Sequence, residues 1–156
     1  MHVMTENTTN TKQFDAADLA MCTCANLRKA ARSVTKSFDD ALRPFDLRAT
    51  QFTLLATLSN SKKRPLTQLA DALGMDRTTL TRNLRPLERR ELIRIDSEKD
   101  LRVKNVSITK GGLKLFEDAL PEWEKVQLLI SGRLGQERWS GFINDLSATT
   151  SITQEN

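Results

Sequence analysis

The stretch from Leu66 to Ile108 constrains the fold of this chain more than any other part of the sequence. It begins with Leu-Thr-Gln-Leu-Ala-Asp-Ala-Leu-Gly at 66–74, which predicts a short amphipathic helix that ends at glycine. Asp76 is a favourable N-cap for a second helix, which the sequence predicts to run to about Arg90. Two helices joined by a short turn containing glycine form the helix-turn-helix pattern.

The second of these helices has two faces of opposite character. At about 100° per residue, Leu80, Leu84 and Leu87 fall within one narrow arc and should face the core. The opposite face carries hydroxyls and guanidiniums, whereas a merely solvated helix normally mixes charge signs. These groups suit phosphates and base edges in a major groove. The candidate DNA-contacting residues of this helix are Arg77, Thr78, Thr79, Thr81, Arg82, Arg85 and Arg89.

Alternating apolar residues after this helix predict a β-hairpin. Ile93 and Ile95 form one strand pattern, Val106 and Ile108 form the returning one, and a polar tip separates them. Thr109 is then a plausible N-cap of the next helix. A hairpin beside a recognition helix would bring basic side chains to the flanking DNA backbone or the minor groove. The candidates are Lys99, Arg102 and Lys104.

In order and spacing, these segments resemble the MarR family of winged-helix transcriptional regulators over roughly residues 17–147. The resemblance implies that Thr78, Thr79, Thr81 and Arg82 read the major groove. It also implies that Arg102 enters the minor groove and that Asp100 orients the wing. The matching pieces are Leu-Thr-Gln-Leu-Ala at 66–70, Leu-Thr-Arg at 80–82, Leu-Glu-Arg-Arg at 87–90, Leu-Ile-Arg at 92–94, Asp100-x-Arg102 and Ile-Thr-x-x-Gly at 108–112.

Two positions depart from the family pattern. Glu91 stands where the family usually has glycine, so the recognition helix should end less cleanly. Pro86 lies inside the same helix, where it removes one backbone hydrogen bond. We expect it to bend the helix near 82–85.

The charge distribution agrees with a DNA-binding lobe. The chain has 156 residues and a net charge of +4, which fits one domain. Residues 62–104 hold twelve Lys and Arg against seven Asp and Glu, a net +5, so the remainder carries −1. There is no long apolar run and no signal peptide, so we expect a cytoplasmic protein with no membrane contact. The Thr-, Asn- and Ser-rich ends, 1–14 and 148–156, are expected to be disordered.

The predicted fold class is mainly α with a small β-wing, in one domain over 15–147. The winged-helix lobe spans about 49–109, and helices over 15–46 and 110–147 flank it. Within these, apolar stripes predict helices at 17–43, 49–59, 110–134 and 136–147, with a bend or interruption at Pro121. The flanking helices are more apolar than one small lobe needs, which favours a homodimer. The family resemblance implies the same two-fold dimer.

The sequence offers little support for catalysis. Its only histidine is His2, it has no tyrosine, and no Gly-rich phosphate loop or metal-ligand spacing is visible. We therefore expect no enzymatic activity, no cofactor and no metal.

Cys22 and Cys24 leave open which signal, if any, the protein detects. On one continuous helix they would point apart and could not bond to each other, with Cys24 on the apolar stripe and Cys22 on the polar side. They fit two incidental thiols of a reducing compartment. In the family comparison, Cys24 matches the reactive cysteine of the organic-hydroperoxide-sensing branch. Arg28, one turn away, could favour its thiolate. The tyrosines with which those sensors bind the thiol are absent.

A small-molecule signal is the other possibility. Phe38 and Phe52, with Trp123 and Met21, suggest an apolar or phenolic effector, although the same residues could be core. The predicted function is a dimeric regulator that binds a double-stranded DNA operator, a repressor released by a small molecule or an oxidant. The alternative is a thiol-based redox protein, a helical dimer without DNA binding. The basic helix face and wing favour the regulator.

Overall fold

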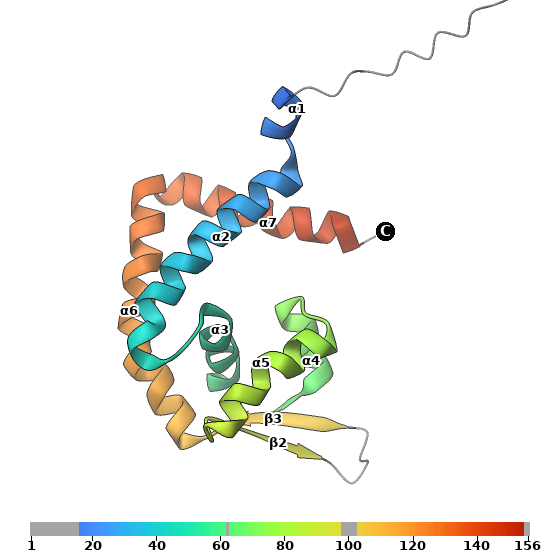
Figure 1. Cartoon of the computed structure of the whole chain (residues 1–156), viewed down its shortest axis with the longest axis vertical. Helices are drawn as coiled ribbons and strands as arrows, with labels where there is room; N and C mark the ends of the chain where they lie inside the picture. The colour runs from blue at the N-terminus through green and yellow to red at the C-terminus, as the bar shows by residue number, and fades with distance from the viewer. Residues whose placement is uncertain (1–15, 62, 98–102, 155–156) are drawn as a thin grey trace, which may run out of the picture. The chain divides into compact units, whose positions relative to one another are not determined.

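The computed structural model describes residues 16–61, 63–97 and 103–154, and these are mostly helical with a small antiparallel sheet (Figure 1). The chain divides into two compact units, residues 1–34 and 35–156. In the described ranges, no helix combines the length and apolarity that a bilayer crossing requires. The elements are α1 (Ala16–Ala20), α2 (Thr23–Leu42), the short helix η1 (Arg43–Phe45), α3 (Ala49–Ser59), β1 (Arg64–Pro65), α4 (Leu66–Leu73), α5 (Arg77–Arg89), β2 (Ile93–Ser97), β3 (Lys104–Ile108), α6 (Lys110–Leu134) and α7 (Gln136–Gln154).

The first unit contains α1 and the start of α2. The prediction of one continuous helix over 17–43 is wrong, because the chain leaves helical geometry at Met21 and Cys22. The side-chain amide of Asn26 donates hydrogen bonds to the carbonyls of Ala20, at 2.8 Å, and Cys22, at 2.9 Å. The first bond gives the Ala20 carbonyl at the end of α1 a partner, whereas the Cys22 carbonyl also accepts the backbone N–H of Asn26 at 3.1 Å.

The core of the second unit lies between α3, α4, α5, the sheet and α6. Leu80, Leu84 and Leu87 are fully buried, which confirms that this arc of α5 faces inward. Helix α3 packs against α5, α6 and β3, and α5 packs against α4 and β2. The other buried apolar residues are Leu42, Leu47, Phe52, Leu54, Leu55, Leu58, Leu66, Leu69, Ala70, Leu92, Ile93, Val106 and Ala119.

The sheet has the strand order β1-β3-β2, and all its pairs are antiparallel. Hairpin register pairs Ile93 with Ile108 and Ile95 with Val106, which confirms the predicted wing strands. The sequence pattern did not indicate β1, which pairs with the far edge of β3. Asn105 is buried beside Val106, so burial on β3 does not strictly alternate as the pattern predicted.

Helix α6 begins directly behind the hairpin. Thr109 is its N-cap: the Thr109 hydroxyl accepts a hydrogen bond from the Gly112 N–H at 3.0 Å and donates to the Glu91 carbonyl at 2.7 Å. The helix runs through Pro121 without interruption and ends at Gly135, where the sequence predicted its end.

The final helix is longer than predicted. Residues 148–154 belong to α7, although the sequence predicted a disordered tail from 148 onwards. In this segment the hydroxyls of Thr149, Thr150 and Thr153 donate to backbone carbonyls one turn earlier. The polar composition that suggested disorder is therefore accommodated within the helix itself.

Candidate nucleic-acid interface

The turn between α4 and α5 sets the start of the recognition helix. Gly74 takes a left-handed conformation, with φ of 60°, which glycine adopts without steric cost. The Met75 N–H then bonds to the Ala70 carbonyl at 2.9 Å and closes the end of α4. Only Met75 and Asp76 separate this glycine from the first residue of α5, so the two helices are held in a tight pair.

Asp76 caps α5 as the sequence predicts. One carboxylate oxygen accepts from the Thr79 N–H at 2.8 Å, and the other accepts from the Thr79 hydroxyl at 2.6 Å. The hydroxyl bond, followed by the backbone N–H of Thr79, lowers the pKa of Asp76 below its usual value of 3.8. The hydroxyl hydrogen of Thr79 is therefore already donated to the Asp76 carboxylate.

This cap predicts a pH dependence of stability. A carboxylate whose pKa is lower in the folded state stabilises the protein above the unfolded value of 3.8, and the contribution is lost as the pH falls through the folded value. Asp76→Asn retains a good cap but does not titrate. As the pH is lowered below about 4, we expect the urea concentration at half unfolding to fall less steeply for Asp76→Asn than for the wild type. The control is Asp71→Asn, an exposed position on α4; equal profiles for wild type and Asp76→Asn would contradict this assignment.

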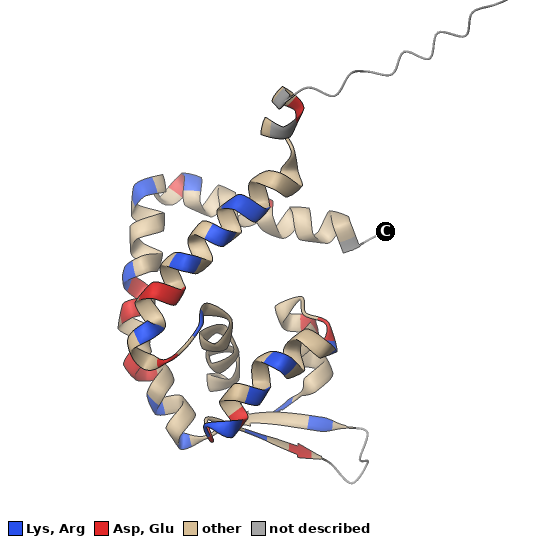
Figure 2. Cartoon of the chain, viewed as in Figure 1, with Lys and Arg blue, Asp and Glu red and all other residues tan. Residues whose placement is uncertain are grey.

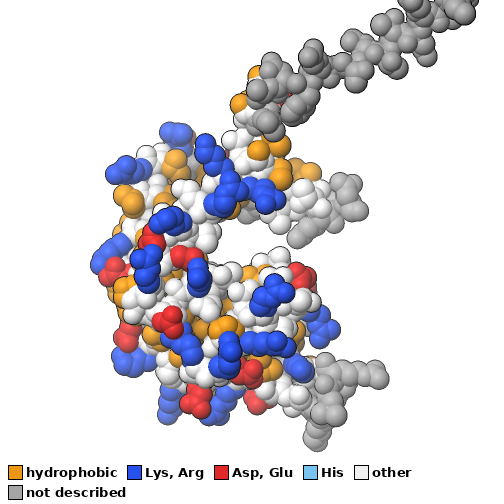
Figure 3. Space-filling model, in the orientation of Figure 1, with side chains coloured by type: hydrophobic (Ala, Val, Ile, Leu, Met, Phe, Trp, Pro, Cys, Tyr) orange, Lys and Arg blue, Asp and Glu red, His pale blue; other side chains and the backbone are white. Residues whose placement is uncertain are grey.

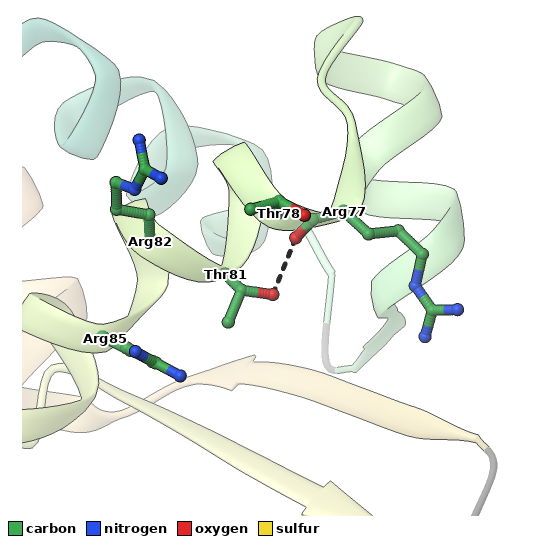
Figure 4. A pocket seen from close by; sticks show the side chains of 5 residues that line it. All are labelled: Arg77, Thr78, Thr81, Arg82 and Arg85. Atoms are coloured by element: carbon green, nitrogen blue, oxygen red, sulfur yellow. Dashed lines mark hydrogen bonds between the residues drawn. The ribbon is translucent and has the colours of Figure 1, made fainter.

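Five residues of α5 line an open hollow of about 320 Å³ on the outward face (Figure 4). Figure 4 shows three guanidinium groups pointing in different directions around two threonines. The Thr81 hydroxyl donates to the Arg77 carbonyl at 2.7 Å, which leaves its oxygen to accept. The lining contains no carboxylate, so the hollow offers donors to an anionic or polar surface. Its residues are Arg77, Thr78, Thr81, Arg82 and Arg85.

A second groove, of about 350 Å³, lies between α5 and the hairpin. Arg77, Arg85 and Lys104 contribute basic groups from both sides, so this structure brings one predicted wing residue to the recognition helix. Glu88 also lines this groove and was missed by the sequence analysis, which considered only the opposite arc of the helix. Figure 2 shows Lys and Arg along α5 and on the strands, with acidic residues among them. The predicted wing-tip residues Lys99, Asp100 and Arg102 lie outside the described residues.

No acidic side chain within the described ranges neutralises the arginines of α5. Among the residues that the structure describes, Arg77, Arg82, Arg85 and Arg89 make no side-chain hydrogen bond or ion pair with one another or with an acidic group. All four are exposed. In the space-filling view, basic side chains also dominate the charged groups near α5 (Figure 3). Unpaired guanidiniums of this kind are available for DNA phosphates or base edges.

The candidate signal residues lie differently from their predicted positions. Cys24 is exposed in this protomer, on the first turn of α2, and Cys22 is half-buried in the break between the helices, so the predicted placement of both cysteines on one continuous helix is wrong. Because Cys22 lies outside both α1 and α2, helical geometry no longer excludes a disulfide bond between Cys22 and Cys24. Arg28 is exposed on the same helix, one turn beyond Cys24.

The candidate effector residues form part of an aromatic cluster. Phe52 is buried and stacks on Trp123, with ring centroids 5.7 Å apart, and it also meets Phe116 at 5.2 Å. Phe38 is half-buried and lies 5.9 Å from Trp123. These contacts place Phe52 in the core of the second unit. In the parts of the chain described here, no three His, Cys, Asp or Glu side chains gather as a metal site would require.

The fold and this basic surface define a winged helix-turn-helix protein. The family model described as MarR family matches residues 47–104, and the DNA-bound transcriptional regulator MosR of Mycobacterium tuberculosis is 34% identical. The MosR comparison has a TM-score of 0.80 and covers 86% of this chain and 97% of MosR. The chain belongs to the MarR family of transcriptional regulators.

Two further comparisons agree, YhbI for the class of protein and CouR for the fold alone. The uncharacterised HTH-type transcriptional regulator YhbI of Bacillus subtilis is 29% identical over 115 residues, which are 70% of this chain and 75% of YhbI. CouR of Rhodococcus jostii, solved with p-coumaroyl-CoA, shares the fold with a TM-score of 0.73 at 18% identity, over 84% of this chain and 93% of CouR. Both YhbI and MosR are named as transcriptional regulators.

Proposed function

We propose that this MarR-family protein is a homodimeric repressor that reads a double-stranded operator with α5 and the wing. The observation that carries the proposal is the carboxylate-free hollow of α5, in which Arg77, Arg82 and Arg85 surround Thr78 and Thr81. In this assignment Arg82 reads a base edge, and Lys104 and the wing arginine contact the flanking backbone or minor groove. The structure of MosR in complex with DNA supports a DNA-binding function.

The flanking helices support a dimer. Helix α6 exposes Leu128 and Leu129, whose exposed fractions are 69% and 54%, and α7 exposes Phe142, Ile143 and Ile152. Monomeric proteins rarely leave so many large apolar residues in solvent on adjoining helices. A two-fold partner that covers them would place two recognition helices on half-sites about one helical turn apart.

The dimer can be tested by placing charge on this apolar surface. We expect Leu128→Glu combined with Leu129→Glu to give a folded monomer, because both side chains are exposed within one protomer. Losing the second half-site should weaken operator binding by about a hundredfold. Sedimentation at micromolar concentration measures the first effect and a mobility shift the second. Ala72→Glu on α4 adds one negative charge elsewhere and should remain dimeric; a monomeric wild type would exclude the proposed assembly.

Release by a signal is the second part of the proposal. Cys24 is the favoured primary thiol if the signal is an oxidant, because it is exposed and Cys22 is only partly so. An apolar or phenolic ligand is the other route. It would have to displace side chains of the aromatic cluster around Trp123, since those rings already contact one another.

One experiment separates these signals and tests the function itself. Duplexes from the DNA flanking the protein's own gene are bound in a mobility shift, then treated with an organic hydroperoxide or a phenolic acid. Oxidant sensing requires release from wild type and Cys22→Ser but not from Cys24→Ser. Ligand sensing requires release from all three by the phenolic acid. Consumption of peroxide without binding to any duplex would favour the alternative, a thiol redox protein that does not bind DNA.

A further inference from the structure

We propose that Arg90 is a positioning residue for operator recognition, which anchors the end of α5 to the turn between α2 and α3 and does not itself contact DNA. The inference rests on the proposed function, because it assigns a role within the same DNA-reading surface. Arg90 follows directly after Arg89 in the basic run at the end of α5, yet the two side chains have different surroundings.

The Arg90 guanidinium is committed to the backbone of another segment. Its Nη1 donates to the Asp46 carbonyl at 2.5 Å, and its Nη2 donates to the Phe45 carbonyl at 3.2 Å. The Asp46 carboxylate lies 3.6 Å from Nη1, but that carboxylate is 93% exposed and contributes little. The exposed fraction of the Arg90 side chain is 32%, so most of it is covered by protein. A guanidinium held by two carbonyls in a fixed fork defines a direction as well as a distance.

Both chain segments joined by Arg90 change direction at unusual residues. Asp46 has φ of 50° and closes η1, and Glu91 has φ of 56° immediately after the end of α5. Residues other than glycine rarely adopt this left-handed conformation, so the surrounding structure must hold it. The Glu91 N–H bonds to the Glu88 carbonyl and the Leu92 N–H to the Leu87 carbonyl, which closes the helix end locally. Arg90 provides the long-range contact between the two turns.

This anchor matters most for base reading. Hydrogen bonds to base edges require side chains of α5 to be placed within fractions of an ångström, whereas contacts to phosphates tolerate small shifts. The leucines of α5 fix its depth in the core, and Arg90 fixes its carboxyl end relative to η1. Loss of the anchor should therefore lower the preference for the operator over random DNA and leave phosphate contacts intact.

Arg89 supplies a matched control one residue away. It is exposed, and its side chain makes no hydrogen bond or ion pair within the described ranges. Arg89→Gln and Arg90→Gln remove the same charge from adjacent positions. A residue that neutralises a phosphate lowers the salt dependence of binding by about one unit when it is removed, whereas a positioning residue does not.

The test measures affinity for a duplex that the wild-type dimer selects from a random-sequence pool, and for unselected duplex, between about 50 and 200 mM salt. For Arg90→Gln we expect about a tenfold loss on the selected duplex only, with the wild-type salt slope. For Arg89→Gln we expect similar losses on both duplexes and a slope lower by about one per protomer, which is about two for the dimer. Asp46→Asn keeps both carbonyl acceptors and should behave as wild type.

Arg90→Lys retains the charge but not the fork, and circular dichroism tests whether each variant is folded. We expect Arg90→Lys to lose part of the preference for the selected duplex at an unchanged salt slope. This result would support the proposal even if Arg90→Gln does not fold. Unchanged affinities in a folded Arg90→Gln, or a lower slope with equal losses on both duplexes, would overturn it. Failure of the wild type to select any duplex would instead contradict the proposed function.

Discussion

Gly112→Ala is expected to destabilise the protein by about 3 kcal/mol or more, or to prevent folding. A β-carbon at this position would lie 2.0 Å from the carbonyl oxygen of Leu92 and 2.9 Å from the Ile108 side chain. The first of these atoms belongs to the backbone at the base of the hairpin, so it cannot move aside by rotating a side chain. Urea unfolding followed by circular dichroism measures the loss.

Gly111→Ala is the matched control for this substitution. Gly111 is exposed, and a β-carbon there would come no closer than 3.7 Å, to the Thr109 hydroxyl. Because alanine favours helices more than glycine does, the control should be neutral or more stable by up to about 1 kcal/mol. Similar losses for the two variants would mean that the first turn of α6 is not packed against the hairpin in this way.

Arg82→Ala should weaken binding to the selected operator by about 1–3 kcal/mol while binding to random duplex changes much less. Arg82 lines the outward hollow of α5, and a guanidinium there can reach guanine through two hydrogen bonds. Competition binding with selected and random duplexes at one salt concentration measures the difference. The effect should concentrate at one base pair of each half-site.

Arg94→Ala removes an equal charge from β2, at a position that lines a different hollow at the base of the hairpin. We expect no selective loss from this control. If Arg82→Ala lost the same affinity on operator and random DNA, Arg82 would be a phosphate contact and base reading would have to come from Thr78 or another residue of α5.

The sequence predicted those elements whose signals are local. Asp76 and Thr109 cap their helices, Gly74 ends α4, and the leucine arc of α5 is buried, because each depends on residues within one or two turns. The groups on the outer face of α5 follow from the same geometry. Helical periodicity therefore sufficed to place most of the candidate DNA-contacting residues.

What the sequence did not predict depends on contacts between distant segments. The strand β1 has only two residues, one of them Pro65, and it is defined by pairing with β3. The break before α2 carries neither glycine nor proline, and it depends on the side chain of Asn26. Arg90 appears in sequence as one more cation of a basic run, and only its bonds to Asp46 and Phe45 distinguish it.

The close approach of Gly112 to Leu92 has a mechanical consequence. The start of α6 and the base of the wing have no space between them, so they must move together as one rigid piece. Helix α6 has 25 residues and is therefore about 37 Å long. A tilt of about 5° at its far end, where the proposed partner would dock, shifts the wing end by about 3 Å over that length. This displacement is close to the rise of one base pair, so a small change in helix pairing would be enough to shift a wing out of register with its half-site.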